Sequence, residues 1–516
     1  MKKFLSVMIA AMLVVSLLSA ALAGDYTYQE PVKIVKMPRS TPAEKGISTQ
    51  YLLNTLNEFE LRGIEMHGID IAVGGDVIFE AFWAPYDEDT PHIVHSLTKL
   101  FTNSAAQVAI SEGYMTLDTK MVDVLSEFVS PDGPLENQDK VTVGNLLNMT
   151  AGYGRMISGS EWRPLKTSWL EAFFAEPVPY EPGTHYQYSS GNPYAVSAMV
   201  QKLTGMTAED YLMKSGFSAL ELRNFTWDKS PEGICSGGNG VSATVEDMLK
   251  IGQLYLNGGS WNGNQILDPE LVKIAIGTGE KLTEGQTTYA LHWTETAEGS
   301  GIYAAGGSYG QQVIIVPDLD MAICCTAGTS GSPTSVFVDC LIEPTRADRT
   351  AGVTSYETDY TDVLAVKTAS LSLLTNPVFT ASPLGEAVDD KEFKAEENKY
   401  NIDSITLDVK DDRITFTMTD DRGTHSIVNG IDQWLVGETS MTGNYMHHQY
   451  QREAEPVVAY AEWKSDTELQ LTWRYPQMAF VDGVTLTFAE DGNQVTYVRT
   501  VNVNSGEKIT EPVVLK

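Results

Sequence analysis

Residues 96–113 read SLTKLFTNSAAQVAISEG, and this stretch carries both a helical pattern and a chemical motif. Apolar residues recur at helical spacing from Leu100 to Ala109, and Gly113 ends the run. Ser96 and Lys99 stand at the start of the predicted helix as an S-x-x-K pair. Because residues i and i+3 share one face of a helix, we expect the lysine amine to reach the serine hydroxyl.

A serine hydroxyl becomes a good nucleophile only when a neighbouring base takes its proton. The N-terminus of the predicted helix adds positive potential, which favours an alkoxide-like Ser96. The motif alone is weak, because Ser96 could equally be a helix N-cap. A second copy of the motif, at residues 505–508, lies in a turn-like stretch with no helix and no partners.

Strand patterns lie on both sides of this helix. Residues 69–73 and 77–83, joined by a Gly-Gly-Asp turn, predict a β-hairpin. A second hairpin is predicted from residues 313–316 and 321–325, with a Pro-Asp turn between them. Helices and loops fill residues 117–271. This order favours an α+β domain, in which helices flank an antiparallel sheet that joins the first and last parts of the domain.

The pattern of apolar and polar residues changes after this domain. We expect a helix over residues 335–342, a polar linker over 343–362 and one more helix over 363–374. Beyond residue 376, apolar and polar residues alternate in repeated short runs, which is typical of an antiparallel β-barrel or sandwich. The predicted domains are therefore an α+β domain over 24–345, a linker and helix over 346–376, and a β-domain over 377–516.

The N-terminus has the pattern of a secretory signal. Lys2 and Lys3 precede an apolar stretch over residues 4–18, and an Ala-Leu-Ala site over 21–23 predicts cleavage before Gly24. The apolar stretch is short for a retained membrane anchor. We therefore expect a secreted, periplasmic or cell-surface protein.

Composition excludes several classes of partner. A chain of 516 residues with a formal charge of −33 repels phosphate backbones and anionic lipid heads, so we expect no nucleic-acid or membrane partner. The four cysteines show no disulfide framework. Neither the histidines nor the cysteines show the spacing of a metal site, and we expect no metal and no organic cofactor.

Further motifs follow Ser96 in a consistent order. Tyr188-Ser189-Ser190 comes after a Pro-Gly turn, and Ala304-Ala305-Gly306-Gly307 precedes Gly310 and an apolar strand. Together with the stretches over 111–118, 146–152 and 238–247, these motifs resemble the class C β-lactamase and penicillin-binding serine hydrolase superfamily. The resemblance covers roughly residues 45–345 and implies that superfamily's α+β fold.

The resemblance implies roles for particular residues. Ser96 matches the nucleophile and Lys99 its partner. Tyr188 matches the tyrosine of a Tyr-x-Asn motif, which relays protons between the nucleophile, the leaving group and water. Ser190 stands where many relatives have Asn. The backbone N–H groups of Ser96 and Gly307 are expected to form the oxyanion hole.

The third motif departs from the family pattern. Ala304-Ala305-Gly306 stands where relatives have Lys-Thr-Gly or His-Thr-Gly, so the cation and the hydroxyl that meet a substrate carboxylate are missing. This departure argues against β-lactams and D-Ala-D-Ala peptides as natural substrates. We expect Ser190 and these three residues to bind substrate. Gln311 and Tyr153 are predicted to line the pocket, although packing roles are equally consistent with the sequence.

Residues 306–310, Gly-Gly-Ser-Tyr-Gly, form a rival G-x-S-x-G motif with Ser308 as the nucleophile. That motif requires a helix after the serine, but a strand is predicted there, so we favour Ser96. His95 and His185 lie next to the two main motifs, and we interpret both as packing residues.

The combined prediction is an exported serine hydrolase that forms an acyl-enzyme on Ser96 and hydrolyses an ester or amide of a small or peptide-like substrate. The alternative is a non-turnover penicillin-binding-like sensor on the same fold, and a third possibility is a structural role of the β-domain. The sequence does not select the substrate.

Overall fold

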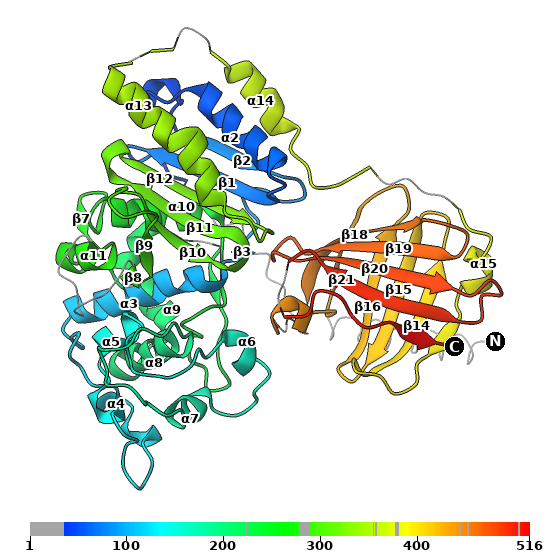
Figure 1. Cartoon of the computed structure of the whole chain (residues 1–516), viewed down its shortest axis with the longest axis horizontal. Helices are drawn as coiled ribbons and strands as arrows, with labels where there is room; N and C mark the ends of the chain where they lie inside the picture. The colour runs from blue at the N-terminus through cyan, green and yellow to red at the C-terminus, as the bar shows by residue number, and fades with distance from the viewer. Residues whose placement is uncertain are drawn as a thin grey trace, which may run out of the picture. The chain divides into compact units, whose positions relative to one another are not determined.

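A computed structural model describes residues 36–516 except 223, 278–288, 291, 354, 357–358, 377–380, 443–444, 451, 453 and 504–505. The predicted signal segment, its cleavage site and Ser505 of the second S-x-x-K copy lie outside the described residues. Two large sheets, of seven and ten strands, and the helices that cover the first of them make up most of the fold (Figure 1), and two small sheets of three and two strands complete it.

The first sheet has seven strands in the order β2-β1-β12-β11-β10-β9-β8, and every neighbouring pair is antiparallel. The hairpin β1–β2 pairs with the late hairpin β11–β12, with Ile71 opposite Ile323. This arrangement confirms the prediction that the sheet joins the first and last parts of an α+β domain. The strands are β1 (Met66–Val73), β2 (Asp76–Phe82), β8 (Tyr289–Ala290), β9 (Trp293–Glu295), β10 (Tyr303–Gly307), β11 (Gln311–Val316) and β12 (Met321–Ala327).

Each face of this sheet has its own core. On one face, α10 (Val245–Leu256) packs against β12, β11 and β1. On the other face, α2 (Thr49–Leu61) and the helices that follow β12 cover side chains such as Ile71 and Ile323. Helices therefore flank both faces of the sheet, as Figure 1 shows.

A helical region lies between the two hairpins in the sequence. Its central element is α3, which contacts α8 and α9. The helices are α3 (Thr98–Ser111), α4 (Met121–Val124), α5 (Val143–Leu147), α6 (Gly159–Trp162), α7 (Trp169–Phe174), α8 (Gly191–Thr204), α9 (Ala208–Lys214) and α11 (Pro269–Ala275). The short strands are β3 (His92–Ile93), β4 (Thr226–Trp227), β5 (Val241–Ala243), β6 (Ser260–Trp261) and β7 (Asn264–Gln265).

The prediction of a linker over residues 343–362 is wrong for its first half, which is helical. α12 (Pro333–Phe337) continues through a π-turn into α13 (Glu343–Ala351), and α14 (Thr361–Ala369) follows. Tyr51 of α2 donates a hydrogen bond to Asp348 of α13 at 2.7 Å, and α14 also contacts α2. The polar composition arises because α13 turns most of its side chains to solvent; only Thr345 of this helix is buried.

The second sheet is barrel-like and contains the C-terminal strands. Its main path is β13-β14-β15-β16-β18-β19-β20-β21-β22, and β17 pairs with β18. A bridge between Ala395 and Leu515 joins the two ends of the path, so the sheet is nearly closed. The strands are β13 (Glu392–Lys394), β14 (Ile402–Val409), β15 (Arg413–Asp420), β16 (Gly423–Gly430), β17 (Leu435–Thr439), β18 (Glu455–Trp463), β19 (Glu468–Arg474), β20 (Val481–Phe488), β21 (Val495–Val501) and β22 (Val513–Leu515); α15 (Gly385–Val388) precedes them.

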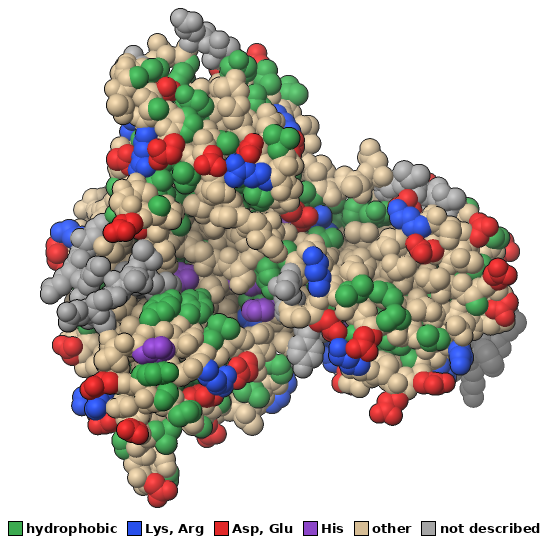
Figure 2. Space-filling view, in the orientation of Figure 1, with side chains coloured by type: hydrophobic (Ala, Val, Ile, Leu, Met, Phe, Trp, Pro, Cys, Tyr) green, Lys and Arg blue, Asp and Glu red, His purple; other side chains and the backbone are tan. Residues whose placement is uncertain are grey.

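The prediction of a largely antiparallel β-domain is confirmed: buried and exposed residues alternate along these strands, and every strand pair is antiparallel except the parallel contact of β16 with β18. In β15, for example, Ile414, Phe416 and Met418 face the core, while the residues between them do not. On the face drawn in Figure 2, acidic and basic side chains are interspersed, and acidic ones are widespread. Among the described residues, no helix is long and apolar enough to cross a membrane.

Candidate active site

Ser96 lies in a single 3-10 turn, His95–Leu97, that leads directly into α3. The turn is held because Val94 N–H bonds to the carbonyl of Val241 in β5 at 2.9 Å. Ser96 is partly exposed, whereas Lys99 on the first turn of α3 is only 3% exposed. The serine is therefore reachable from solvent, and the amine is enclosed beside it.

An amine and a phenol meet at the Ser96 hydroxyl, which makes a group of three polar side chains. Lys99 Nζ lies 3.1 Å from Ser96 Oγ, and Tyr188 Oη lies 3.0 Å from the same oxygen. Lys99 Nζ also donates to the carbonyl of Gly238 at 2.7 Å and lies 4.9 Å from the centre of the Tyr188 ring. Residues up to 92 positions apart in the chain thus place an amine and a phenol within hydrogen-bond distance of one hydroxyl.

Tyr188 is held by the turn that precedes α8. Gln187 N–H bonds to the carbonyl of Met149 at 2.8 Å. The buried Ser189 hydroxyl accepts hydrogen bonds from the backbone N–H groups of Ile157 and Gly191. Because both neighbours of Tyr188 are bonded to other segments, the phenol has little freedom to leave the serine.

The loop over 236–240, which supplies the carbonyl for Lys99, is tied to α3. Thr102 Oγ1 donates to the carbonyl of Gly237 at 2.6 Å. Gly237 has a φ of +60°, and a Cβ there would stand 2.3 Å from the carbonyl oxygen of Pro193, so only glycine fits. Ser190 lies against Gly238 in this loop, close to the atom that binds the amine. The predicted substrate residue Ser190 therefore lies beside the group of three.

Strand β10 runs past the same turn. A Cβ on Gly307 would stand 2.3 Å from the carbonyl oxygen of Val94, so this glycine allows the strand to approach the turn that carries Ser96. The three residues before Gly307 differ in exposure: Gly306 is exposed, Ala305 is fully buried and Ala304 is partly buried. Through residues 304–306, this strand presents neither a cation nor a hydroxyl next to the site.

The predictions that Gln311 and Tyr153 line the pocket are wrong. Gln311 is fully buried, and its amide bonds to the backbone carbonyls of Ser308, Tyr309 and Ala327. Tyr153 is 2% exposed and packs its ring on Phe173 in the core. Neither side chain can line an open pocket, because other parts of the protein already surround both.

His95, which we interpreted as a packing residue, connects the site with the barrel-like sheet. It is 2% exposed, and its ring is surrounded by those of Tyr309, His448, Tyr450 and Phe480. Tyr450 Oη lies 3.4 Å from His95 Nδ1. Burial holds the pKa of His95 well below its usual value, so this ring is neutral at ordinary pH. The residue before Ser96 is thus packed by the C-terminal part of the chain.

Sequence reasoning missed His292. It is buried and donates a ring N–H to the carbonyl of Gly306 at 3.1 Å. Burial, together with the nearby charge of Lys99, lowers the pKa of His292 well below its usual value. Its neutral ring therefore holds strand β10 through the hydrogen bond to Gly306. His292 belongs to none of the motifs found in the sequence. Its position beside β10 becomes visible only once β9 is paired with β10.

The remaining candidates lie apart from this cluster. Ser308 is exposed and lies in a short turn between β10 and β11. The strand that follows it rules out the strand–turn–helix geometry of a nucleophile elbow. His185 stacks on Tyr180, with ring centres 4.0 Å apart. The four cysteines are all free thiols.

Known proteins share this arrangement of elements. The chain is 24% identical over 311 residues to the 6-aminohexanoate-dimer hydrolase of Paenarthrobacter ureafaciens, which covers 55% of this chain and 78% of that protein. It is 22% identical over 302 residues to a candidate D-alanyl-D-alanine carboxypeptidase of Escherichia coli O157:H7, covering 46% and 69%. A solved structure from Bacillus anthracis, a candidate 6-aminohexanoate-dimer hydrolase, superposes with a TM-score of 0.51 at 19% identity, covering 62% and 90%.

The β-lactamase family model matches residues 65–338, which is more than half of the chain and includes β1, α3, α8 and β10–β12. The match therefore contains Ser96, Lys99, Tyr188 and Gly307 within one family domain. This protein belongs to the β-lactamase family and has hydrolases among its homologues.

Proposed function

We propose that this protein is an exported serine hydrolase that forms an acyl-enzyme on Ser96 and hydrolyses an ester or amide bond. The observation that carries the proposal is the convergence of Lys99 Nζ and Tyr188 Oη within 3.1 Å of Ser96 Oγ. The partial exposure of that serine also supports it. The predicted signal segment is the basis for export.

The proposed first step is attack of Ser96 Oγ on the substrate carbonyl carbon. In this step Lys99 Nζ takes the serine proton, and its hydrogen bond to the Gly238 carbonyl holds the amine beside Ser96 Oγ. The backbone N–H groups of Ser96 and Gly307 bind the oxyanion. The proton then passes through Tyr188 Oη to the leaving alcohol or amine, and the acyl-enzyme remains.

In the second step, a water molecule attacks the ester carbon of the acyl-enzyme. Tyr188 or Lys99 takes the water proton and returns it to Ser96 Oγ, so the acid product leaves and the site is restored. Every proton that these residues accept is returned within the cycle.

Labelling with a fluorophosphonate probe tests the nucleophile. We expect one phosphonylated serine per chain, and peptide mapping should locate it at Ser96. Labelling at any other serine would overturn the assignment. A substrate panel then tests turnover: a 6-aminohexanoate dimer, a D-Ala-D-Ala peptide, a short-chain nitrophenyl ester and nitrocefin. Release of several equivalents of product from any of them supports a hydrolase.

A second candidate function is a sensor that acylates without turnover. The absence of a cation or hydroxyl from residues 304–306 favours it, because the strand then offers fewer groups to hold a substrate. The same panel separates the two functions. A sensor gives a burst of at most one equivalent of product per chain with no steady release, whereas a hydrolase continues beyond the burst.

A further inference from the structure

The turn that carries Ser96 is held in place by the short strand pair β3 and β5. Val241 of β5 bonds to residues on both sides of the serine. Its carbonyl accepts a hydrogen bond from Val94 N–H at 2.9 Å, and its own N–H donates to Thr98 Oγ1 at 3.0 Å. A shift of β5 would therefore move the residues that precede and follow Ser96.

Two segments of the barrel-like sheet bond to this strand pair. Arg452, in the segment before β18, donates from Nη2 to the hydroxyl of Ser242 in β5 at 2.8 Å. The carbonyl of Gln477, between β19 and β20, accepts a hydrogen bond from Ile93 N–H of β3 at 2.8 Å. Ile93 pairs with Ser242 across the two strands, and its side chain belongs to the core of the barrel-like sheet. Both strands are thus anchored on that sheet.

The Arg452 guanidinium joins these contacts in one network. Its Nη1 donates to Oε1 of Gln477 at 3.0 Å and lies 3.3 Å from Oε2 of Glu455, the first residue of β18. The Arg452 side chain is only 19% exposed. A guanidinium is planar, and its donors point in fixed directions. Arg452 therefore sets the position of Ser242 relative to two residues of the barrel-like sheet.

Glu455 supplies the charge that keeps Arg452 in this position. Glu455 is fully buried, and its Oε1 atom has no hydrogen-bond partner among the described residues. Burial raises the pKa of Glu455 to about 7, and the Arg452 guanidinium opposes this shift. A buried carboxylate is costly unless a cation stays beside it. The fold therefore favours the arrangement in which Arg452 remains between Glu455 and Ser242.

From these contacts we propose that Arg452 is a positioning residue for Ser96: it holds β5, and through β5 the turn of the serine, against the barrel-like sheet. A displacement of about 1 Å at a reacting group can cost about 10²-fold in rate. The barrel-like sheet is then a required part of the active site. This inference rests on the proposed function, because the step that it affects is the acylation of Ser96.

The rate and the final extent of fluorophosphonate labelling of the full chain test this role. Arg452→Met should slow labelling of Ser96 by about 10–100-fold and still reach one label per chain. A merely structural role would instead lower the labelled fraction without slowing the folded molecules. Labelling at the wild-type rate in Arg452→Met would overturn the positioning role alone. Failure of the wild-type chain to label at Ser96 would overturn the proposed function as well.

Ser242→Ala tests the same contact from the other side, and it is the smaller change if Arg452→Met fails to fold. It removes the hydroxyl that Arg452 binds and leaves the bonds of Arg452 to Gln477 and Glu455 in place. Ser242→Ala should slow labelling by a similar factor, and the double variant should be no slower than Arg452→Met, because both changes break one contact. Multiplied effects in the double variant would contradict the proposal.

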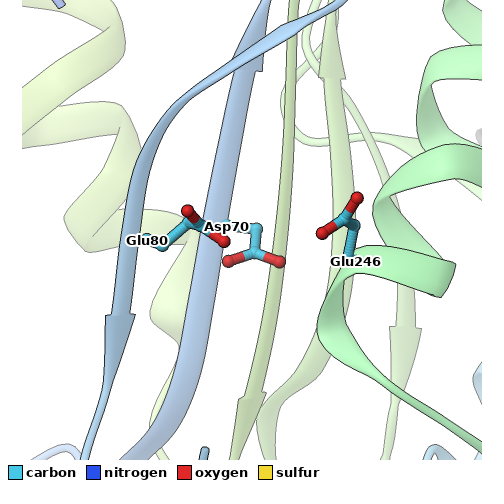
Figure 3. A group of neighbouring side chains, drawn as sticks. All are labelled: Asp70, Glu80 and Glu246. Carbon is cyan, nitrogen blue, oxygen red and sulfur yellow. The ribbon is translucent and has the colours of Figure 1, made fainter. Parts of the chain in front are cut away.

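Arg39 provides a matched control, because it is a second arginine that joins separate elements. It bonds to Glu80 of β2 at 2.7 Å and to Glu246 of α10 at 2.6 Å, and Figure 3 shows these two carboxylates with Asp70 between them. Within the described part of the chain, Arg39 bonds to no residue of β3 or β5. Arg39→Met should lower the thermal midpoint and leave the labelling rate unchanged. Slowing as large as that of Arg452→Met would overturn the specific role of Arg452.

Discussion

Ser96 and Ser308 both stand in hydrolase motifs, but the fold treats them differently. Ser96 is partly exposed at the start of a helix, with an amine at 3.1 Å and a phenol at 3.0 Å. Ser308 is exposed in a turn between two strands, and no hydrogen bond of its hydroxyl is recorded among the described residues. A serine hydroxyl becomes a good nucleophile only where neighbouring groups can take its proton, and Ser96 has two such groups within hydrogen-bond distance.

The largest expected effect comes from exchanging the two serines for alanine. Ser96→Ala should lower the rate of ester hydrolysis by about 10⁴-fold or more, because the variant lacks the proposed nucleophile. Ser308→Ala should change the rate by less than about twofold, as surface substitutions usually do. Steady-state hydrolysis and probe labelling measure both variants. Loss of labelling in Ser308→Ala alone would reverse the comparison.

Lys99→Ala should slow acylation by about 10²–10⁴-fold, the usual contribution of a general base. Because the side chain is almost fully buried, truncation also leaves a cavity, so near-ultraviolet circular dichroism must show that the fold persists. Lys99→Met, which fills the space without an amine, is the matched control for packing. Labelling at the wild-type rate in either variant would remove the base role.

Tyr188→Phe should slow turnover by about 10²-fold, because it removes only the hydroxyl that contacts Ser96. The ring that faces Lys99 remains, so protein stability should hardly change. Tyr186→Phe, at an exposed position two residues away, is the control and should keep the wild-type rate. Equal rates in the two variants would show that the phenol is dispensable.

Adjacent glycines of β10 give a further test. Gly307→Ala should reduce acylation by about 10²-fold and destabilise the protein by roughly 1–3 kcal/mol, because the new methyl group meets the Val94 carbonyl next to the nucleophile. Gly306→Ala has open space around its new Cβ and should leave the thermal stability unchanged. Rate measurements and thermal unfolding compare the two. Similar effects would contradict the close approach at Gly307.

The smallest expected effect concerns the barrel-like sheet. Tyr450→Phe removes the hydroxyl 3.4 Å from His95 and should slow acylation by about fivefold or less, the worth of one ordinary hydrogen bond. Pre-steady-state labelling has the sensitivity for a change of this size. A loss as large as that of Tyr188→Phe would mean that Tyr450 acts in the chemistry and not through His95.

Much of this arrangement could be predicted from residue order. Helical spacing after Ser96 and strand alternation in both hairpins report local geometry, because a side chain's burial repeats with the period of its own element. Predictions failed where burial depends on distant neighbours. Gln311 and Tyr153 have polar atoms typical of a pocket, yet contacts from other segments enclose both. The polar composition of residues 343–351 led to the prediction of a linker, whereas these residues form α13. A helix on the protein surface needs few apolar residues.

The sequence by itself determined the family's fold, the S-x-x-K helix and the alternating strands, since these depend on neighbours along the chain. Only the tertiary structure decided that Tyr188 reaches Ser96, that Gly307 passes the turn before α3, and that Asp70, Glu80 and Glu246 meet. These groups lie between 10 and 211 residues apart in the chain. Their distances depend on how whole elements pack, and no local pattern in the sequence records that packing.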